Sequence, residues 1–507
     1  DPETPPDTGP LDTPVSFEAP TNKFASPEIP APAPRLTQAG TDTFDFRFAH
    51  LIGVGGCGMS AVAWALLACG VRVSGSDLSN NANCRRLRDA GAQIFIGHDA
   101  DQIDQQDCII VSSAIREDNP ELLCARANGI RILHRSEALA LFLAQRKSIL
   151  VTGTHGKTTT TAMTGIAMEA AGLDPWVFVG GTVPAFDNNT RVGGMEWAVA
   201  EADESDGTFE RLPAQHLIVT NVEEDHMDYW QTPERMVDGY RRVIANASED
   251  AIVLMSHDDP GAVDLRRTIQ RPVLTYSLRQ EVGNYSASRI ELRAFGSAFD
   301  FFIGRQRVRR FELGAPGIHN VSNALAALAM THELGGDVVK AGKALAKFHG
   351  VGRRFEIKGE HSGITIVDDY GHHPTEIAAT LLSARRAADK MGGRLIVAFQ
   401  PHRYSRTLNL MDGFARAFDN VVDRLILTEI YAAGEQEIPE ARLDVLLNRI
   451  VSCREAPGVD VIRDRKAIPA YMAQHLRRGD VVLTLGAGDI TKVGPEILQA
   501  LVTRSSR

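Results

Sequence analysis

Several signals that would define a protein class are scarce or absent in this sequence of 507 residues. The six cysteines form no CxxC pair and show no metal-finger spacing, which argues against a disulfide scaffold and against a zinc finger. We expect buried free thiols in a reducing cytoplasm at Cys57, Cys69, Cys84, Cys108, Cys124 and Cys453. Basic residues number 54 against 64 acidic ones, a net charge of −10. This balance argues against a general binder of nucleic acid or anionic membranes, which would need excess Lys and Arg.

Long apolar segments are also missing. The longest uncharged apolar stretch runs from Met59 to Val71 and is shorter than the ~20 residues that cross a bilayer, so it predicts a buried helix and no membrane insertion. The start of the sequence has no charged segment followed by an apolar core, so we expect a cytoplasmic protein without a secretory signal. The first residue is Asp1 and not Met, so the natural N-terminus need not be part of this sequence.

The sequence is expected to divide into a tail and three domains, since ~150 residues make a typical domain. Ten of the 24 prolines fall within the first 34 residues, which predicts a disordered tail over residues 1–45 without a catalytic role. Apolar runs then alternate with Ala-rich helical segments, which predicts an α/β fold with parallel sheets. We expect three consecutive α/β domains: a Rossmann-like domain over 46–147, a P-loop ATPase-like domain over 148–350 with antiparallel strands between 285 and 311, and a second Rossmann-like domain over 351–507.

The first chemical motif is a GxGxxG sequence, Gly53-Val54-Gly55-Gly56-Cys57-Gly58, between a predicted strand (49–52) and a predicted helix. Glycines let backbone N–H groups approach a pyrophosphate closely. Asp77 ends the next strand, where a carboxylate can bind a ribose hydroxyl. The motif fits NAD(P), FAD or a nucleotide sugar equally well.

The second motif is a phosphate loop, Thr152-Gly153-Thr154-His155-Gly156-Lys157-Thr158-Thr159, between the strand 148–151 and a helix. Lys157 can reach the β- and γ-phosphates of a nucleotide, and the Thr158 hydroxyl can bind Mg²⁺. The standard loop has a glycine where this chain has Val151, so we interpret the loop as a shortened variant. Two acidic runs, 201–206 and 221–228, are expected to end adjacent strands beside this loop and to supply oxygen ligands for Mg²⁺.

A third set of polar residues follows two predicted strands of the last domain, at 368–376 and 400–406. Arg403 and Arg406 are three residues apart, so in a helix they would share a face and could hold a carboxylate.

These motifs resemble, in the same order, those of the Mur ligases: GTHGKTTT, EADESD, TNVEEDHMD, GIHNVSNALAA, GRRFE, DDYGHHPTE and QPHRYSRT. The resemblance covers about residues 46–495, and the last two motifs are similar to the alanine-adding branch of the family. It implies an ATP-dependent ligase of peptidoglycan precursor synthesis. ATP would phosphorylate the lactyl carboxylate of UDP-N-acetylmuramate, and the amine of L-alanine would attack the acyl phosphate. ATP, two Mg²⁺ ions and these two substrates are the implied partners, and we expect a monomer or weak homodimer.

The resemblance also implies roles for individual residues. Lys157, His226, His372 and Arg403 would be catalytic, and the metal ligands would be Thr158, Glu201 and His226. ATP would be bound by Gly153, Thr154, His155, Gly156, Lys157, Thr158, Thr159, His319, Asn320, Asn323, Arg354 and Asp369. The amino acid would be bound by Tyr370, His372, Arg403 and Arg406. The UDP-sugar would be bound by Gly53, Gly55, Gly56, Gly58, Met59, Asp77, His98, Ser112 and Ser113.

One departure from the family concerns a carbamylated lysine that bridges metals in several Mur ligases, some fifteen residues beyond the equivalent of His226. This chain has Tyr240-Arg241-Arg242 there, as in the alanine-adding branch, so we expect no lysine carbamate. Three alternatives remain open. A recycling ligase that joins a tripeptide to the same UDP-sugar should lack Arg403 and Arg406. A dinucleotide-binding oxidoreductase or sensor would rest on the GxGxxG motif and Asp77 alone, and a P-loop regulator would only bind nucleotide.

Overall fold

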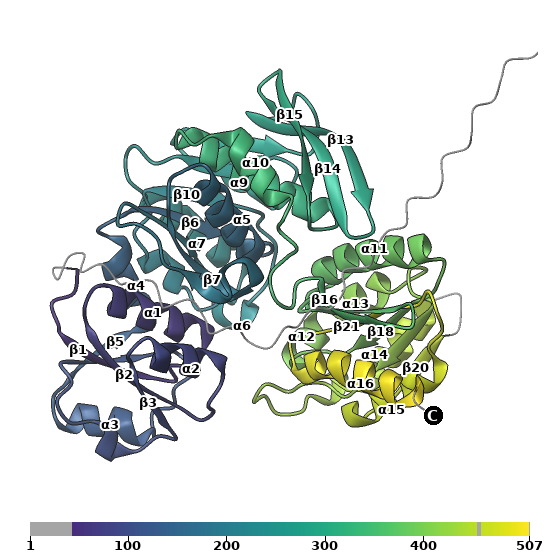
Figure 1. The fold of residues 1–507 in the computed structure, drawn as a ribbon, viewed down its shortest axis with the longest axis horizontal. Coiled ribbons are helices and arrows are strands. Elements are labelled where there is room, and N and C mark those ends of the chain that lie inside the picture. Colours follow the sequence, from purple (N-terminus) through teal and green to yellow (C-terminus); the bar gives the residue numbers. More distant parts are fainter. Residues whose placement is uncertain (1–42, 454–457, 506–507) are drawn as a thin grey trace, which may run out of the picture. The chain divides into compact units, whose positions relative to one another are not determined.

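The computed structural model describes residues 43–453 and 458–505, so nearly all of the predicted tail (1–45) lies outside the described residues. The described chain is a mixed α/β protein with three separate sheets (Figure 1). The first sheet belongs to the N-terminal domain and is parallel, with the order β3-β2-β1-β4-β5. The elements of this domain are β1 (Phe48–Ile52), α1 (Cys57–Ala68), β2 (Arg72–Asp77), α2 (Ala82–Asp89), β3 (Gln93–Ile96), β4 (Cys108–Val111), α3 (Pro120–Ala127), β5 (Arg131–His134) and α4 (Arg135–Leu143).

Helix α1 is the apolar stretch that the sequence predicts to be a buried helix, and most of its residues are buried. It packs against α2 and α4 of its own domain and against β7 of the next domain. Within the described residues, no helix is both long and apolar enough to cross a bilayer. Cys57, Cys69, Cys84, Cys108 and Cys124 are free thiols, as expected, but Cys57 and Cys124 are only half-buried. Cys57 remains accessible because it lies in the glycine-rich turn that opens α1.

The middle domain contains a sheet with the order β15-β14-β13-β12-β11-β10-β6-β9-β7-β8. Its strands are β6 (Lys147–Thr152), β7 (Trp176–Val183), β8 (Asn188–Arg191), β9 (Trp197–Glu201), β10 (His216–Val219), β11 (Val253–Ser256), β12 (Leu274–Ser277), β13 (Tyr285–Arg293), β14 (Gly296–Ile303) and β15 (Gln306–Leu313). Its helices are α5 (Lys157–Ala170), α6 (Met227–Trp230), α7 (Pro233–Ala245), α8 (Pro260–Arg267), α9 (Ile318–Glu333) and α10 (Val338–Leu345).

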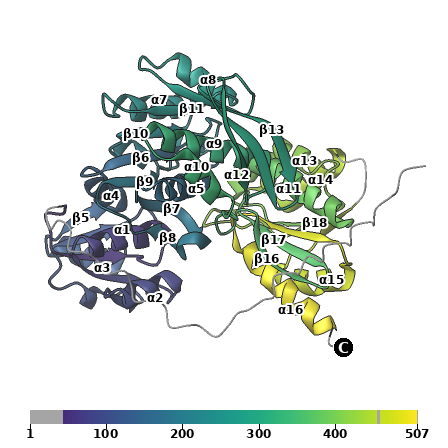
Figure 2. The same cartoon turned by 45° about the horizontal axis from the view of Figure 1, so that its top comes forward.

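The strand that leads into the phosphate loop, β6, lies inside this sheet between β9 and β10 (Figure 2 labels all three). Helix α5 follows the loop and packs against α9 and α10, and all three contribute to the main hydrophobic core. The antiparallel strands predicted between 285 and 311 are confirmed as β13–β15, which continue the parallel sheet beyond β12. The expectation that the two acidic runs end adjacent strands is wrong, because β9 and β10 flank β6 on opposite sides.

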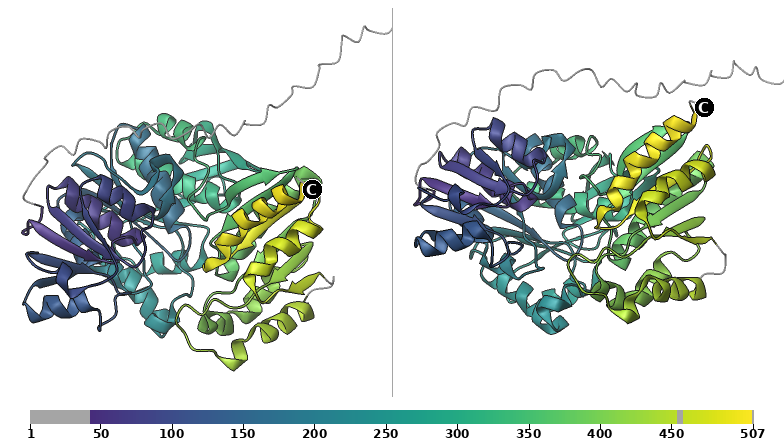
Figure 3. Two further views of the ribbon diagram at one scale, coloured as in Figure 1. Left: turned by 60° about the horizontal axis from the view of Figure 1, so that its bottom comes forward. Right: turned by 90° about the horizontal axis from the view of Figure 1, so that it is seen from below.

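The C-terminal domain has a sheet with the order β16-β17-β21-β18-β19-β20, in which only β16 is antiparallel to its neighbour. Helices cover both faces. One core involves α11, α13 and α14, and the other involves α15 and α16, the yellow pair in Figure 3. The elements are β16 (Glu356–His361), β17 (Ile364–Asp369), α11 (Pro374–Met391), β18 (Leu395–Phe399), α12 (Tyr404–Asn409), α13 (Met411–Ala417), β19 (Arg424–Leu427), α14 (Leu443–Cys453), β20 (Val459–Val461), α15 (Ile468–His475), β21 (Val481–Leu485) and α16 (Val493–Ser505).

An aromatic contact joins the N-terminal and middle domains. Phe142 of α4 lies edge-on to Trp176 and Phe178 of β7, with ring centroids 5.0 and 5.3 Å away. All three rings are buried. Beside them, the Asn189 side-chain amide of β8 donates to the Cys57 carbonyl at the start of α1, over 2.5 Å. The glycine-rich turn of the first domain is thus anchored directly to the second.

Candidate active site

The phosphate loop folds as the sequence predicts, between β6 and α5, and its glycines are required by the backbone. Gly153 has φ +127°, and a Cβ there would collide with the Thr220 hydroxyl and lie 2.8 Å from the Asn221 carbonyl. Gly156 has φ +82°, and a Cβ would lie 2.8 Å from Asn323 Oδ1. The His155 carbonyl accepts hydrogen bonds from the Thr220 hydroxyl (2.7 Å) and from the Asn221 amide (2.8 Å). The loop conformation is therefore set by the two residues that follow β10 as well as by its own residues.

Lys157, the first residue of α5, turns back into the loop. Its ammonium group donates to the carbonyls of Gly153 (2.8 Å) and Thr154 (3.1 Å) and to Glu204 Oε2 (2.7 Å). Glu204 is fully buried, and burial raises the pKa of its carboxyl to about 7 even though Lys157 opposes the shift. Lys157 is buried as well, but the nearby carboxylates outweigh the burial and raise its pKa above its usual value. A cation thus lies where a phosphate would bind.

Carboxylates and one imidazole surround this lysine. Glu201, at the end of β9, accepts hydrogen bonds from the Thr158 hydroxyl (2.9 Å) and from the Gly180 amide (2.7 Å). Asp203, Glu204 and His226 each place one possible ligand atom within 4.8 Å of the others. The second oxygen of Glu204, Oε1, is buried and has no hydrogen-bond partner in the described structure. The two acidic loops thus converge on the phosphate loop from either side of β6.

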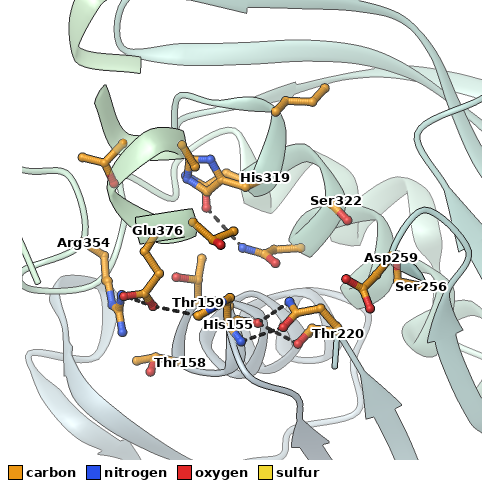
Figure 4. Close-up of a pocket in the computed structure, with 18 of the residues that line it drawn as sticks. His155, Thr158, Thr159, Thr220, Ser256, Asp259, His319, Ser322, Arg354 and Glu376 are labelled. Carbon is orange, nitrogen blue, oxygen red and sulfur yellow. Dashed lines mark hydrogen bonds and ion pairs between the residues drawn. The ribbon is translucent and has the colours of Figure 1, made fainter. Parts of the chain in front are cut away.

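A cavity of ≈ 310 Å³ lies beside the phosphate loop, between the middle and C-terminal domains (Figure 4). Nine of the twelve predicted nucleotide residues line it: His155, Gly156, Thr158, Thr159, His319, Asn320, Asn323, Arg354 and Asp369. Of the other three, Thr154 and Lys157 line a second cavity described below, and Gly153 lines neither. Burial lowers the pKa of His319 to about 4, so its ring is neutral. Asn320 donates to the Pro316 carbonyl (2.7 Å), and Asn323 donates to Asn320 Oδ1 (3.3 Å), so one amide orients the other. The lining offers apolar surface, hydrogen-bonding amides and a guanidinium, which suits a nucleoside phosphate.

A larger cavity of ≈ 910 Å³, which we call the transfer cavity, lies on the other side of the loop. Its lining combines Lys157, Thr158, Glu201 and His226 of the middle domain with Tyr370, His372, Arg403 and Arg406 of the C-terminal domain. The predicted metal and amino-acid residues therefore share one cavity, although they come from different sheets.

Three details of the transfer cavity differ from expectation or add to it. Arg403 precedes α12 with φ +68°, so the idea that Arg403 and Arg406 share a helical face is wrong, although both line the cavity. His226 also has a positive φ, +55°. Non-glycine residues rarely adopt this conformation, and such strain gathers at functional sites. Burial lowers the pKa of His372 to about 3, so its ring is neutral.

A third cavity, of ≈ 410 Å³, lies at the glycine-rich turn of the N-terminal domain. Six of the predicted UDP-sugar residues line it: Gly53, Gly56, Gly58, Met59, Asp77 and Ser112. Gly55 lies behind them, where its amide donates to Asp77 Oδ2 over 2.9 Å. Ser113 lines the transfer cavity instead. His98 lines neither this cavity nor the transfer cavity. Its ring nitrogen Nδ1 lies 2.9 Å from the buried carboxylate of Glu121. Cys57, Gly180, Glu201 and Asp203 line both this cavity and the transfer cavity, so the two are contiguous.

Comparisons with known proteins agree with this arrangement. Family models described as "Mur ligase family, catalytic domain", "Mur ligase middle domain" and "Mur ligase, glutamate ligase domain" match residues 49–147, 151–331 and 353–488. The UDP-N-acetylmuramate–L-alanine ligase of Anaeromyxobacter dehalogenans (strain 2CP-C) is 42% identical over 452 residues, 89% of this chain and 97% of that protein. The chain belongs to the Mur ligase family. The ligase of the same name from Myxococcus xanthus is 42% identical over 454 residues, 90% of this chain and 95% of that protein.

Solved structures of Mur ligases share the fold. The crystal structure of UDP-N-acetylmuramate-alanine ligase from Thermotoga maritima superposes with a TM-score of 0.75 at 28% identity, covering 90% of this chain and 99% of that one. A murein peptide ligase from Psychrobacter arcticus superposes with a TM-score of 0.66 at 22% identity, covering 90% of this chain and 98% of that one. The expected three-domain α/β fold of a Mur ligase is thereby confirmed.

The site of this Mur ligase also contains three residues that were not predicted as site residues. Glu204 bonds to Lys157, and Glu376, in the first turn of α11, contacts both Arg354 and His155. Arg353 donates to the Gly486 carbonyl over 2.6 Å and lies against Tyr370. All three lie inside motifs that point to the family, EADESD, GRRFE and DDYGHHPTE. Their position within the motifs could have drawn attention to them, but their partners could not be read from sequence.

Proposed function

We propose that this Mur ligase uses ATP to join L-alanine to the lactyl carboxylate of UDP-N-acetylmuramate through an acyl phosphate, a step of peptidoglycan precursor synthesis. The relatives that are 42% identical over about nine-tenths of the chain carry this activity in their name. The observation that supports it most strongly is the transfer cavity. It is contiguous with the cavity at the glycine-rich turn, and it is lined by the phosphate-loop lysine, by residues of both acidic loops and by four arginines, among them Arg403 and Arg406. Three reactants can therefore meet in one place.

In this proposal the ≈ 310 Å³ cavity binds the nucleoside of ATP, and the phosphate chain runs along the loop to Lys157. A carboxylate is a poor acceptor for an amine, and phosphate is a good leaving group, so activation by ATP makes the amide bond accessible. Lys157 stabilises the charge of the transferred phosphoryl group. Arg354 contacts the nucleotide phosphates and Asp369 the ribose, both from the C-terminal domain.

The donor set fits Mg²⁺, which prefers oxygen ligands and bridges phosphates. Thr158 and Glu201, already 2.9 Å apart, would hold one ion, and His226 would belong to a second site. The buried, unpartnered Oε1 of Glu204 offers a further oxygen beside His226. When bound, the metal would neutralise phosphate charge. The hydrogen bond from the Gly180 amide holds the Glu201 carboxylate in place at the start of the first acidic loop.

The amino acid would bind at the C-terminal side of the transfer cavity, where Arg403 and Arg406 can hold its carboxylate. Arg406 already lies 3.7 Å from Asp225 and 3.2 Å from His402 Nδ1, so its guanidinium is oriented by both domains. His372 would contact the amine. Its neutral ring, with a pKa of about 3, makes it a hydrogen-bond partner and not a strong base.

ADP release tests the proposal, measured over a panel of amino acids and the tripeptide, each with and without UDP-N-acetylmuramate. We expect release that requires both the UDP-sugar and L-alanine. Release with the tripeptide in place of alanine would assign the protein to the recycling ligases. Tight NADH binding with no response to the UDP-sugar would favour an oxidoreductase or a sensor, and nucleotide binding without turnover would favour a regulator.

A further inference from the structure

Glu376 connects the phosphate loop with two cavities: the transfer cavity and the ≈ 310 Å³ cavity, which we call the nucleotide cavity. It lies in the first turn of α11, and its side chain is only 10% exposed. Among the described residues of the C-terminal domain, Arg354 and Glu376 are the two that line both cavities. Figure 4 shows Arg354, Glu376 and His155 turned toward one another.

One carboxylate oxygen, Oε1, faces two cations from different parts of the chain. It accepts a hydrogen bond from Arg354 Nη1 over 3.2 Å and lies 3.4 Å from His155 Nδ1. Arg354 comes from the segment that joins the two domains, and His155 comes from the phosphate loop. On its other side the His155 ring lies 3.0 Å from Glu223 Oε2. His155 therefore lies between a carboxylate of its own domain and one of the C-terminal domain.

The second oxygen, Oε2, faces His372. It accepts from the His372 backbone amide over 3.3 Å and lies 3.5 Å from His372 Nδ1. The same Nδ1 lies 3.2 Å from the Tyr370 carbonyl. Two acceptors at Nδ1 favour the tautomer with its proton there, which leaves the lone pair of Nε2 free to accept from a substrate amine.

We propose that Glu376 is a positioning residue that links the nucleotide site to the amino-acid site. Its carboxylate holds Arg354 toward the nucleotide, holds His372 in the tautomer that accepts at Nε2, and docks both against His155 of the phosphate loop. The inference rests on the proposed function and deepens it. Although burial opposes ionisation, the Arg354 guanidinium and the neighbouring imidazoles hold the pKa of Glu376 well below its usual range, so the carboxylate is charged at neutral pH.

The link predicts a specific kinetic signature. A residue that served only ATP would affect the KM of ATP, and one that served only the amino acid would affect the KM of alanine. Glu376→Gln keeps the size of the side chain but replaces one acceptor oxygen with a donor that faces Arg354 or His372. We expect the KM values of ATP and of alanine each to rise about tenfold or more, with that of UDP-N-acetylmuramate within about twofold of wild type.

A double-mutant cycle tests the contact across the domains. His155→Gln and Glu376→Gln remove partners of one interaction, so their effects on kcat/KM for ATP should be strongly non-additive. Glu440→Gln is the matched control, because Glu440 is an exposed glutamate of the same domain that lines none of the three site cavities. We expect wild-type constants for it. If Glu376→Gln lowers Tm strongly, Glu376→Asp, which keeps the charge, decides the question with smaller but parallel increases in both KM values.

The outcomes separate the two claims. A wild-type protein that releases no ADP with alanine and UDP-N-acetylmuramate would refute the proposed function, and the role of Glu376 with it. An active wild type whose Glu376 variants raise only one KM, or raise all three equally, would overturn the linking role alone. Additive effects of the His155 and Glu376 substitutions would do the same.

Discussion

Lys157 and Glu204 form an ion pair of 2.7 Å in the wall of the phosphate loop, with 11% and 1% of their side chains exposed. A buried pair of this kind is costly to break by removing one partner, unless the remaining group can become neutral. Glu204 can do so, because its pKa already lies at about 7. A bound triphosphate would compete with Glu204 for the same ammonium group.

Lys157→Ala should therefore abolish phosphoryl transfer without unfolding the protein. We expect kcat for ADP release to fall by about 10³ or more, because a charge contact in the transition state is lost. Tm should change little, since Glu204 takes up a proton. Lys340→Ala, an exposed lysine of α10, serves as the control and should match wild type. Near-normal turnover of Lys157→Ala would show that the phosphate assignment is wrong.

Substitutions at two neighbouring glycines of the N-terminal domain should have different effects, one on folding and the other on ligand binding. A Cβ at Gly55 would collide with the Asn81 side chain and lie 2.8 Å from Asp77 Oδ2, whereas at Gly56 the nearest atom would be 3.4 Å away. We expect Gly55→Ala to lower Tm. Gly56→Ala should keep the wild-type Tm but raise the KM of the UDP-sugar, because Gly56 lines the cavity. An unchanged KM in Gly56→Ala would place the UDP-sugar elsewhere.

Arg403→Ala should act mainly on the amino acid. The guanidinium borders the transfer cavity on the C-terminal side, so its loss removes a charged contact to the substrate carboxylate and should raise the KM of alanine about tenfold or more. The KM of ATP should stay near wild type. Arg442→Ala, an exposed arginine paired with Glu437, is the control. A change confined to the KM of ATP would contradict the role of Arg403 in binding the amino acid.

The pH dependence of stability should reveal the positive charge on the His155 ring. Burial opposes its charge, but hydrogen bonds to Glu223 and Glu376 outweigh burial and raise its pKa from 6.5 to about 9. A raised histidine pKa stabilises the folded state fully below pH 6.5, and this contribution is lost as pH rises to 9. It amounts to about 3 kcal/mol from the size of the shift.

The measurement for His155 is the free energy of unfolding between pH 6 and pH 9.5, in wild type and in His155→Gln. The difference between them should shrink as pH rises. His349→Gln, which changes an exposed histidine, should follow wild type at every pH. A difference that is independent of pH would mean that the two carboxylates do not hold a charged ring.

Activity should not depend on bicarbonate. The position that carries a carbamylated lysine in several Mur ligases falls at Tyr240-Arg241-Arg242 here, and Tyr240 is fully buried. Assays in carbonate-free buffer, with and without added bicarbonate, should give equal rates. A rate that rises with bicarbonate, or a modified lysine found by mass spectrometry in the metal site, would refute this.

Much of the fold and site could be predicted, because strong local patterns carry them. The long apolar strands, the helix at Met59–Val71 and the loops at strand ends follow from composition and glycine placement. Short, half-exposed edge strands such as β3 and β20 were not predicted, because a few residues of weak pattern form strands only when a neighbour pairs with them. The order of β9 and β10 around β6 was predicted wrongly, since sheet order depends on crossover connections and not on sequence order.

The polar partners of the site were beyond prediction for a different reason. Glu204 and Glu376 occur in motifs, but their roles come from partners elsewhere in the chain, Lys157 at the start of α5 in one case and His155 of another domain in the other. Sequence shows which groups can ionise. It does not show which buried groups face one another, and this decides their charge.

The rings of Phe142, Trp176 and Phe178 between the first two domains differ in kind from the polar pairs between the last two. Opening the aromatic seam would wet three large apolar surfaces, a cost that added salt does not relieve. The carboxylate, imidazole and guanidinium groups of the other interface regain hydrogen bonds to water when their contacts open, although their burial leaves them only weakly screened by salt while the contacts are closed. Separating the C-terminal domain from the middle domain should therefore cost less free energy than separating the N-terminal domain from the middle domain, because exposed polar groups bind water and exposed aromatic rings do not.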